Sequence, residues 1–431
     1  MNPTRTMPSP SARNSPSGGP VESAVDTVRV GLLGRGNVGG AFVDELEELN
    51  DSIAAGIGIK PVISGVLRRS EGDFEEILAD ANVIVELMGG CDPTREYVER
   101  ALKAGRHVVT ANKQLVAMHG EELSRIAGEH KVHFRYEAAI AVAIPIVPVL
   151  QSHLLVTHID QVMGIVNGTT NFLLDAMASE GLDFGEALAR AQELGYAEPD
   201  PTEDINGKDA AAKMAILARL AFGTSVSLDD VSYEGVEGID LDDIVYAKEF
   251  GLSLKLLGIA ERRGESLGVR VFPCFVSDKH PLASVHGPFN AVTIDAPAVE
   301  QITMSGRGAG ARATAAIVLN DVVAAAAGGL QGPYTFAAEQ LKINNADQRS
   351  CFYIHMIVVD QPGVLSGVAD RLAEHGISIE SAVQRGLGEK ARLVLVTHEC
   401  DESDLWEALL DIAKLNVTRS DPRAIRVREL E

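Results

Sequence analysis

The stretch that decides the fold is Val28-Arg29-Val30-Gly31-Leu32-Leu33-Gly34-Arg35-Gly36-Asn37-Val38-Gly39, near the N-terminus of a chain of 431 residues. Its first half is a short apolar run typical of a buried strand, and residues 41–46 continue as a predicted helix. The G-x-G-x-x-G turn between them indicates a dinucleotide-binding unit, because it stands between a strand and a helix. Gly34 permits the tight turn, Gly36 lets a pyrophosphate approach the backbone, and Gly39 lets the helix pack closely.

Short apolar strands and helices alternate outward from this turn. Strands are predicted at residues 62–67, 83–87 and 107–110, and a helix at 95–104. This alternation implies βαβ units and a parallel sheet. The fold class is therefore α/β, with a Rossmann-type domain over residues 27–150.

Ligands of such sheets bind beyond the carboxyl ends of the strands. Besides the glycine turn, two ends carry motifs: Glu86-Leu87-Met88-Gly89-Gly90 and Thr110-Ala111-Asn112-Lys113. Lys113 is the cation placed to reach the nicotinamide, and the alternative is a surface lysine beyond a strand. The cofactor contacts expected at these ends are Gly34, Gly36, Asn37, Val38, Gly39, Gly89 and Lys113.

The second predicted strand ends in Leu67-Arg68-Arg69-Ser70 and not in the acidic residue that binds the 2′-hydroxyl of NAD. Two guanidinium groups and a hydroxyl suit a 2′-phosphate, so Arg68 is expected to contact the cofactor. The sequence thus favours NADP, with NAD possible. The alternative is that these arginines lie in a solvated loop. An insertion over residues 51–60 would explain the long interval between Gly34 and Arg68.

Composition excludes several classes of protein. The formal net charge of −23 argues against nucleic-acid and anionic-membrane partners. No apolar run approaches the roughly 20 residues of a membrane helix. Residues 1–26 lack the apolar stretch of a secretory signal and are expected to form a disordered tail, with organelle targeting as the alternative. Four widely spaced cysteines show no metal-ligand pattern and indicate a reducing, cytoplasmic setting.

The regular alternation of short strands and helices ends after residue 150. The mixed elements that follow predict an α+β unit over residues 151–340. Asp183-Phe184-Gly185-Glu186 has the form of a capping box and opens a helix that stops at Gly195. A loop rich in proline and acidic residues follows, and then an alanine-rich helix. The other elements predicted here are strands at 269–276 and 291–294 and a buried helix at 311–327.

A third unit is predicted over residues 350–431. Its elements follow the order βαββαβ, which is typical of a ferredoxin-like domain. The strands are predicted at 352–359, 377–383, 391–398 and 424–427, and the helices at 364–375 and 404–415.

The loop and helix after Gly195 carry the most chemistry. Asp209 and Lys213 are four residues apart and share one helix face, which three intervening alanines leave open. A lysine general acid needs a lowered pKa, from burial or from a nearby cation such as Lys113. Glu198 and Asp204 are placed to hold a substrate ammonium. The alternative for Asp209 and Lys213 is a surface ion pair that contributes a few tenths of a kcal/mol.

At these residues the chain resembles the homoserine dehydrogenases, which interconvert L-aspartate 4-semialdehyde and L-homoserine. The resemblance spans roughly residues 28–340. The matching motifs are Glu86-Leu87-Met88-Gly89-Gly90, Thr110-Ala111-Asn112-Lys113, Asn167-Gly168-Thr169-Thr170-Asn171, the segment Leu194–Lys213, and Gly306-x-Gly308-Ala309-Gly310.

The resemblance implies roles for particular residues. Lys213 would donate the proton in the reductive direction, and Lys113 would contact nicotinamide and substrate and assist the proton transfer. Asp209 would act with the two lysines. The other implied contacts are those of the homoserine end, at Glu198, Asp204 and Asp209, and those of the cofactor, at Gly195, Glu198 and Gly310.

The resemblance also implies a monovalent cation, usually sodium, near the hinge between the first two domains. Its ligands would be the Glu137 carboxylate and the backbone carbonyls of Ile140, Val142 and Ile144, an oxygen-only set that suits a hard ion. The family usually has glycines here, and this chain has Ile140-Ala141-Val142-Ala143-Ile144. Side-chain bulk and lost backbone freedom are expected to alter the loop.

The third unit resembles an ACT domain in Asp360-Gln361-Pro362-Gly363-Val364-Leu365 and Ile377-Ser378-Ile379. ACT domains pair and bind amino acids at their interface. The resemblance implies threonine as the effector and a homodimer or homotetramer as the assembly. The alternative is a domain used only for oligomerisation.

Two other functions stay open at this point. One is another amino-aldehyde or hydroxy-acid dehydrogenase with the same first domain. The other is a non-catalytic sensor of NADP and amino acids. Absence of NADPH oxidation that depends on aspartate semialdehyde would favour the first alternative. A Lys213→Ala variant that keeps its function would favour the second.

Overall fold

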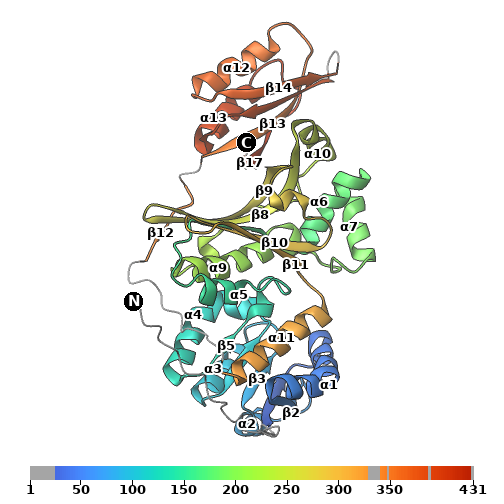
Figure 1. Ribbon diagram of the computed structural model, residues 1–431. Helices are drawn as coiled ribbons and strands as arrows, with labels where there is room; N and C mark the ends of the chain where they lie inside the picture. The colour runs from blue at the N-terminus through green and yellow to red at the C-terminus, as the bar shows by residue number, and fades with distance from the viewer. Residues whose placement is uncertain (1–24, 329–339, 347–348, 387–389, 429–431) are drawn as a thin grey trace, which may run out of the picture.

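The computed structural model describes residues 25–328, 340–346, 349–386 and 390–428. Three units lie along one long axis, with the N-terminal unit at one end and the C-terminal unit at the other (Figure 1). The tail predicted over residues 1–26 falls almost wholly outside the described residues.

The first unit is the predicted parallel sheet. Apolar strands such as β3 (Val83–Glu86) are fully buried, as their sequence indicated, and the strand order is β2-β1-β3-β4-β5. The remaining elements are β1 (Asp26–Leu33), β2 (Ile59–Leu67), β4 (His107–Thr110), β5 (Phe134–Arg135), α1 (Asn37–Ile57), α2 (Phe74–Asp80), α3 (Thr94–Lys103) and α4 (Lys113–His130). Residues 51–60, expected as an insertion, extend α1 and open β2.

Helix α11 (Ala311–Ala326) belongs to the first unit in space although it follows the second in sequence. Its buried residues, among them Ala315 and Val318, share one apolar core with Val30 of β1 and Phe42 of α1. Figure 1 shows α11 beside α1, next to the parallel sheet. This return of the chain brings Gly310 back to the edge of the sheet that carries the glycine turn.

The middle unit is an antiparallel sheet in the order β11-β10-β6-β8-β9. Helix α9 (Lys208–Phe222) packs on it so closely that a Cβ at Gly258 would meet Met214 Cγ at 2.3 Å. The strands are β6 (Gln161–Ile165), β8 (Leu252–Arg263), β9 (Ser266–Ser277), β10 (Phe289–Ala296) and β11 (Glu300–Arg307). Helices α6 (Gly168–Glu180), α7 (Phe184–Glu193), which begins with the predicted capping box, and α10 (Leu241–Ala247) also belong to this unit, and the short helix α5 (Ile146–Pro148) precedes β6.

The loop predicted over residues 196–206 contains a short helix, α8 (Thr202–Ile205), that the sequence analysis did not anticipate. Its four residues are too few to show a periodic apolar pattern. The helix turns the chain sharply just before α9, and Asp204 lies within it.

The C-terminal unit has the predicted order βαββαβ. Its elements are β13 (Arg349–Val358), α12 (Val364–Glu374), β14 (Ile379–Arg385), β15 (Ala391–Thr397), α13 (Glu402–Ala413) and β17 (Arg423–Arg428). Its sheet is not separate from the middle one: β17 pairs in parallel with β9 through Arg426 and Cys274, Val427 and Phe275, and Arg428 and Val276. The sequence analysis did not predict this continuity.

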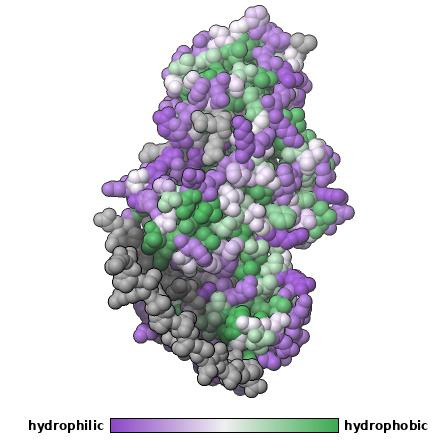
Figure 2. All heavy atoms as spheres, viewed as in Figure 1, coloured by the Kyte–Doolittle hydropathy of each residue, from purple (hydrophilic) through white to green (hydrophobic). Residues whose placement is uncertain are grey.

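Charged contacts support the junction between these two units. The Arg426 guanidinium donates to both carboxylate oxygens of Glu234, at 3.0 and 2.9 Å, and to Glu402 of its own unit. Arg428 donates to Glu261 at 3.1 Å. In the view of Figure 2, hydrophilic residues predominate on the C-terminal unit, and apolar residues gather in small separate patches. In the part of the chain that the structure describes, no helix combines the length and apolar character needed to span a membrane.

Candidate active site

A cleft of about 730 Å³ lies between the first unit and the middle unit. Its walls come from the carboxyl ends of the parallel strands, from the start of α6 and from the loop before α9. Of the residues predicted from sequence, the cleft is lined by Val38, Gly89, Lys113, Gly195, Glu198, Asp204, Asp209, Lys213 and Gly310, together with Ile140 and Val142.

The glycine turn has the shape that a pyrophosphate requires. Gly34 has a φ of +93°, and a Cβ there would meet the Leu87 carbonyl oxygen at 2.6 Å. A Cβ at Gly39 would meet the Gly34 carbonyl oxygen at 2.2 Å, whereas a Cβ at Gly36 would meet nothing within 4 Å. Helix α1 has no side-chain cap and no acidic residue in its first turn. Its N–H groups and partial positive charge therefore suit an anion.

The predicted arginines follow β2 at the same edge of the sheet. The Gly34 N–H donates to the Leu67 carbonyl at 2.9 Å, so Arg68 stands directly beside the glycine turn. Arg68, Arg69 and Ser70 are exposed. Glu71 lies 3.3 Å from the Arg68 guanidinium and is its partner in this structure.

A buried carboxylate fixes the turn at the end of β3. Glu86 accepts hydrogen bonds from the Met88 and Gly89 N–H groups at 2.7 and 3.2 Å, and from the Thr110 hydroxyl at 2.5 Å. Burial raises the pKa of Glu86 despite these contacts. Because Thr110 ends β4, this one side chain ties the ends of two neighbouring strands together.

The next polar residue places Lys113. The Asn112 N–H donates to the Thr110 hydroxyl at 2.9 Å, and the Asn112 amide donates to the Gly90 carbonyl at 2.6 Å. The Asn112 carbonyl oxygen caps α4 by accepting from the Leu115 N–H at 3.1 Å. Lys113 is the first residue of that helix, so its backbone is held against the Gly89-Gly90 turn.

Two lysines from different units meet at one carboxylate. Asp209 is 4% exposed; its Oδ1 pairs with Lys113 Nζ and its Oδ2 lies 2.9 Å from Lys213 Nζ. Burial raises the pKa of Asp209, but the ammonium groups of Lys213 and Lys113 lower it by more. The pKa of Asp209 is therefore below its usual value, and Asp209 is ionised. Burial lowers the pKa of Lys113, and Asp209 outweighs that effect and leaves it raised.

This arrangement corrects one expectation. The sequence analysis treated Lys113 as a cation that acts on Lys213, but a carboxylate lies between the two ammonium groups. Lys213 Nζ also donates to the Val166 carbonyl at 2.8 Å. Asp209 and Val166 are thus the two partners of Lys213 Nζ among the residues that the structure describes, which leaves one N–H able to donate to an oxygen atom in the cleft.

Asn167 is a site residue that was not predicted from the sequence. Its amide nitrogen donates to Asp204 Oδ1 at 2.7 Å and to Asp209 Oδ2 at 2.8 Å. Asn167 opens the motif Asn167-Gly168-Thr169-Thr170-Asn171, and its role as a helix N-cap could have been read from that pattern. Its two carboxylate partners could not, since they stand 37 and 42 residues away.

The expected cation ligands lie beside the cleft. Glu137 is 6% exposed; its Oε1 accepts from the Ile146 and Val147 N–H groups at 2.8 and 3.3 Å. Its Oε2 is buried and has no hydrogen-bond partner among the described residues. Burial, and then Asp321, raise the pKa of Glu137 to about 8. A carboxylate oxygen that lacks a partner fits the binding of a cation.

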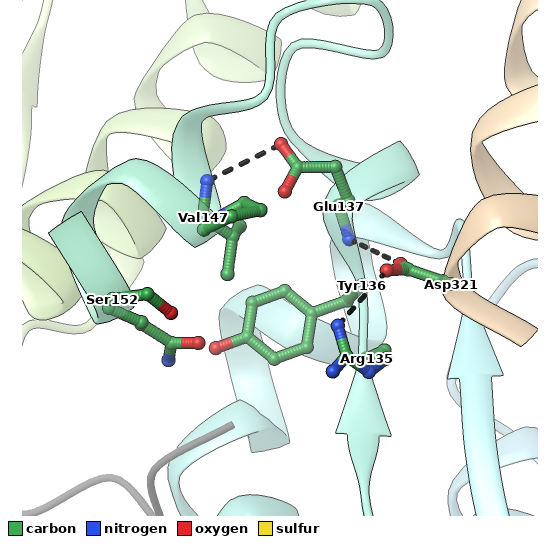
Figure 3. Close-up of a pocket in the computed structure, with 8 residues that line it drawn as sticks. Arg135, Tyr136, Glu137, Val147, Ser152 and Asp321 are labelled. Carbon is green, nitrogen blue, oxygen red and sulfur yellow. Dashed lines mark hydrogen bonds and ion pairs between the residues drawn. The ribbon is translucent and has the colours of Figure 1, made fainter. Parts of the chain in front are cut away.

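The pocket in Figure 3 borders this carboxylate. The Glu137 N–H donates to Asp321 Oδ2 at 3.1 Å, and Arg135 lies 3.7 Å from the same aspartate. Val142, one of the residues that replace glycine, has a φ of +47°. A β-branched residue rarely adopts this conformation, and it costs on the order of 1–3 kcal/mol. The loop therefore keeps a glycine-like backbone despite the valine side chain.

A dinucleotide fold whose cleft ends in a lysine–aspartate–lysine cluster defines an NAD(P)-dependent oxidoreductase. Family models for the homoserine dehydrogenase NAD-binding domain, for homoserine dehydrogenase and for the ACT domain match residues 34–137, 145–323 and 353–416. The chain belongs to the homoserine dehydrogenase family, whose members act on a CH–OH group with a nicotinamide cofactor.

Individual relatives agree over nearly the whole chain. The homoserine dehydrogenase of Corynebacterium glutamicum is 41% identical over 418 residues, covering 91% of this chain and 94% of that protein. That of Bacillus subtilis is 37% identical over 425 residues, with 93% and 98% covered. The crystal structure of a homoserine dehydrogenase from Thiobacillus denitrificans superposes with a TM-score of 0.87 at 33% identity, covering 94% of this chain and 99% of that one.

Proposed function

We propose that this homoserine dehydrogenase reduces L-aspartate 4-semialdehyde to L-homoserine on the route to threonine and methionine, with Lys213 as the proton donor. One observation carries the assignment of roles. A buried aspartate at the end of the dinucleotide cleft holds Lys113 and Lys213 together, and Lys213 retains one proton for the cleft.

The residues divide the work of the reduction. The bound nicotinamide would supply a hydride to the aldehyde carbon. Lys213 gives the developing alkoxide its proton, so that one C–H and one O–H bond form. Lys113 lies next to the cofactor turn, where it contacts the substrate oxygen and assists the proton transfer. Asp209 pairs with both ammonium groups and orients them for this step.

Two acidic residues of the same cleft suit the amino-acid end of the substrate. Glu198 and Asp204 line the same cleft as Lys213, and the exposed carboxylate of Glu198 is free to turn toward a ligand. We assign them to the substrate ammonium, with Glu198 also contacting the cofactor. Gly195 and Gly310 present backbone without side chains to the nicotinamide end.

We propose NADP as the preferred cofactor. Arg68, Arg69 and Ser70 follow β2 beside the glycine turn and supply two positive charges and a hydroxyl, which fit a 2′-phosphate. NAD lacks that phosphate, so it would make no such contact with Arg68 and Arg69. We further propose that Glu137 and the carbonyls of Ile140, Val142 and Ile144 hold sodium, because Glu137 Oε2 has no hydrogen-bond partner within the described part of the chain.

The ACT domain supports control by an amino acid, and we propose threonine as the effector of a homodimer or homotetramer. Its sheet is continuous with the catalytic sheet through β17 and β9, which supplies a physical route between the two units. An end product of the pathway that binds here would slow its own synthesis.

The deciding experiment is an assay of the purified protein with aspartate semialdehyde. NADPH oxidation is measured against NADH oxidation, each with and without threonine. We expect higher kcat/KM with NADPH and a slower rate with threonine, and serine at equal concentration is the control. Absence of aldehyde-dependent oxidation would refute the reaction, and equal rates with and without threonine would refute the effector.

A further inference from the structure

Asn167 uses every hydrogen-bonding atom of its side chain. It stands between β6 and α6 and is 4% exposed. Its carbonyl oxygen accepts from the Thr170 N–H at 2.8 Å and from the Thr170 hydroxyl at 3.0 Å. Its amide nitrogen donates one proton to Asp204 and the other to Asp209. The amide therefore has a single orientation that satisfies all of these partners.

The two carboxylates would repel each other without this amide. Asp204 Oδ1 and Asp209 Oδ2 both lie within hydrogen-bond distance of the same nitrogen atom. Two carboxylates this close move apart or share a proton unless donors lie between them. Asn167 supplies two donors without adding a charge, so both carboxylates stay in place.

The fixed position of Asp209 determines where the lysines stand. Asp209 Oδ2 accepts from both Asn167 and Lys213, which leaves Oδ1 for Lys113. Val166, the residue before Asn167, also holds Lys213: its carbonyl oxygen accepts from Lys213 Nζ at 2.8 Å. Two consecutive residues at the end of β6 thus set both the carboxylate and the proton donor.

We infer that Asn167 is a positioning residue for the reaction: its amide fixes Asp204 and Asp209 relative to each other and so holds the proton donor in line with the substrate oxygen. This inference rests on the roles proposed for Lys213 and Asp209. Asn167 itself contacts neither the transferred hydride nor the transferred proton, and it acts through Asp209 and Lys213. A displacement of about 1 Å at such a centre lowers the rate by about 10²-fold.

The alternative is that Asn167 serves only as the N-cap of α6. Two variants separate the roles, because serine and aspartate are both good N-caps. Asn167→Ser keeps the cap and is neutral, but it loses both amide donors. Asn167→Asp keeps the cap and adds a third carboxylate beside Asp204 and Asp209.

We expect Asn167→Ser to keep the wild-type melting temperature to within a few degrees. Asn167→Asp should melt at a lower temperature, because it adds a third carboxylate at a buried position. Both variants should bind NADPH as wild type does. In both, kcat for semialdehyde reduction falls by about 10²-fold. The pH profile of homoserine oxidation distinguishes them. In Asn167→Asp the added negative charge holds the proton on the neighbouring ammonium, and the rising limb moves up by about one pH unit. In Asn167→Ser the limb does not move upward.

Thr170→Val is the matched control. It removes the hydroxyl contact to the Asn167 carbonyl oxygen and leaves both carboxylate contacts intact. Its kcat and pH profile should equal those of wild type. A capping role alone is the conclusion if Asn167→Ser also retains wild-type kcat, and the inference then fails.

Lys213→Ala in the same series separates this failure from a failure of the proposed mechanism. If Lys213→Ala is inactive and Asn167→Ser is fully active, only the inference is wrong. If Lys213→Ala keeps wild-type kcat, the proposed proton donor is wrong and the role of Asn167 falls with it.

Discussion

His355 Nδ1 of the C-terminal sheet lies 2.8 Å from Asp243 Oδ1 of helix α10, and both side chains are buried. Arg423 lies 3.7 Å from the same carboxylate. The neighbouring Asp242 pairs with Arg392 of β15. The contact thus joins the ACT domain to the catalytic unit through a buried polar pair, in addition to the pairing of β17 with β9.

We predict that His355→Phe destabilises the contact between these units by about 1–3 kcal/mol, because it leaves the buried Asp243 carboxylate without its main partner. The measurement is denaturant unfolding followed through Trp406, the single tryptophan, which lies on α13. Arg371→Gln breaks an exposed ion pair with Glu374 and should change stability by less than about 0.5 kcal/mol. Equal effects of the two variants would contradict a structural role for the pair.

Lys213→Ala should lower kcat for semialdehyde reduction by about 10²–10⁴-fold, because it removes the general acid. Steady-state kinetics and NADPH titration by fluorescence measure catalysis and cofactor affinity separately, and the affinity should not change. Lys208→Ala is the control on the same helix, since the Lys208 ammonium donates to Glu203 at 2.9 Å. It should retain wild-type kcat.

Replacing both Arg68 and Arg69 by alanine should raise KM for NADPH by about tenfold or more, since each charge-assisted contact to phosphate contributes about 1.5–3 kcal/mol. KM for NADH should stay within twofold of wild type. Arg29→Ala, which breaks an exposed contact to Asp80, controls for lost surface charge. A parallel rise of KM for both cofactors would argue against binding of the 2′-phosphate.

Lys255 makes the free energy of unfolding depend on pH. Its ammonium is 3% exposed and donates to Val285 O at 2.6 Å and Asn171 Oδ1 at 3.2 Å. Burial lowers its pKa from 10.5 to about 8. Because the folded value is the lower one, this contribution to stability is present above pH 10.5 and is lost as the pH falls through about 8.

Relative to Lys255→Met, wild type should therefore lose about 3 kcal/mol of unfolding free energy between pH 10.5 and pH 8, with little further change below. Denaturant titrations of both proteins at several pH values measure the difference, and general alkaline effects cancel in it. A difference that does not vary with pH would mean that Lys255 is neutral or solvated throughout.

Sodium should raise the melting temperature of wild type by about 2–4 °C relative to tetramethylammonium at equal ionic strength. Glu137→Gln should abolish the difference, because the amide cannot supply the charged oxygen ligand. Glu129→Gln, at the exposed end of α4, should retain the full sodium effect. If Glu137→Gln responds like wild type, the cation binds elsewhere.

Local signals made much of the fold predictable. The Gly34–Gly39 turn and the apolar strands around it depend on neighbours in sequence, and the structure follows them closely. The capping box at Asp183 and Glu186 is equally local. Strand β6 was missed, and both of its neighbours in the sheet, β8 and β10, lie about 90 residues or more along the chain. Strands β8 and β11 were also missed, although each forms a hairpin with an adjacent strand. The union of β17 with β9 joins residues about 150 positions apart, for which no periodicity gives a signal.

The same distinction applies to the site. Asp209 and Lys213 stand one helical turn apart, and their spacing alone indicated a pair. The contact between Lys113 and Asp209 spans 96 residues and was not predicted from the sequence. Asn167 carried only the signal of a helix cap. Its function depends on how β6 and α9 approach each other, which sequence patterns do not encode.

The pairing of β17 with β9 also bears on how such a chain can be shortened. Cys274, Phe275 and Val276 have β17 as their neighbour on one side, so removal of the ACT domain would expose their backbone groups along an apolar strand. Unpaired edges of this kind self-associate. Removal of the ACT domain is therefore expected to lower solubility, and a shortened chain needs a new cover for that edge.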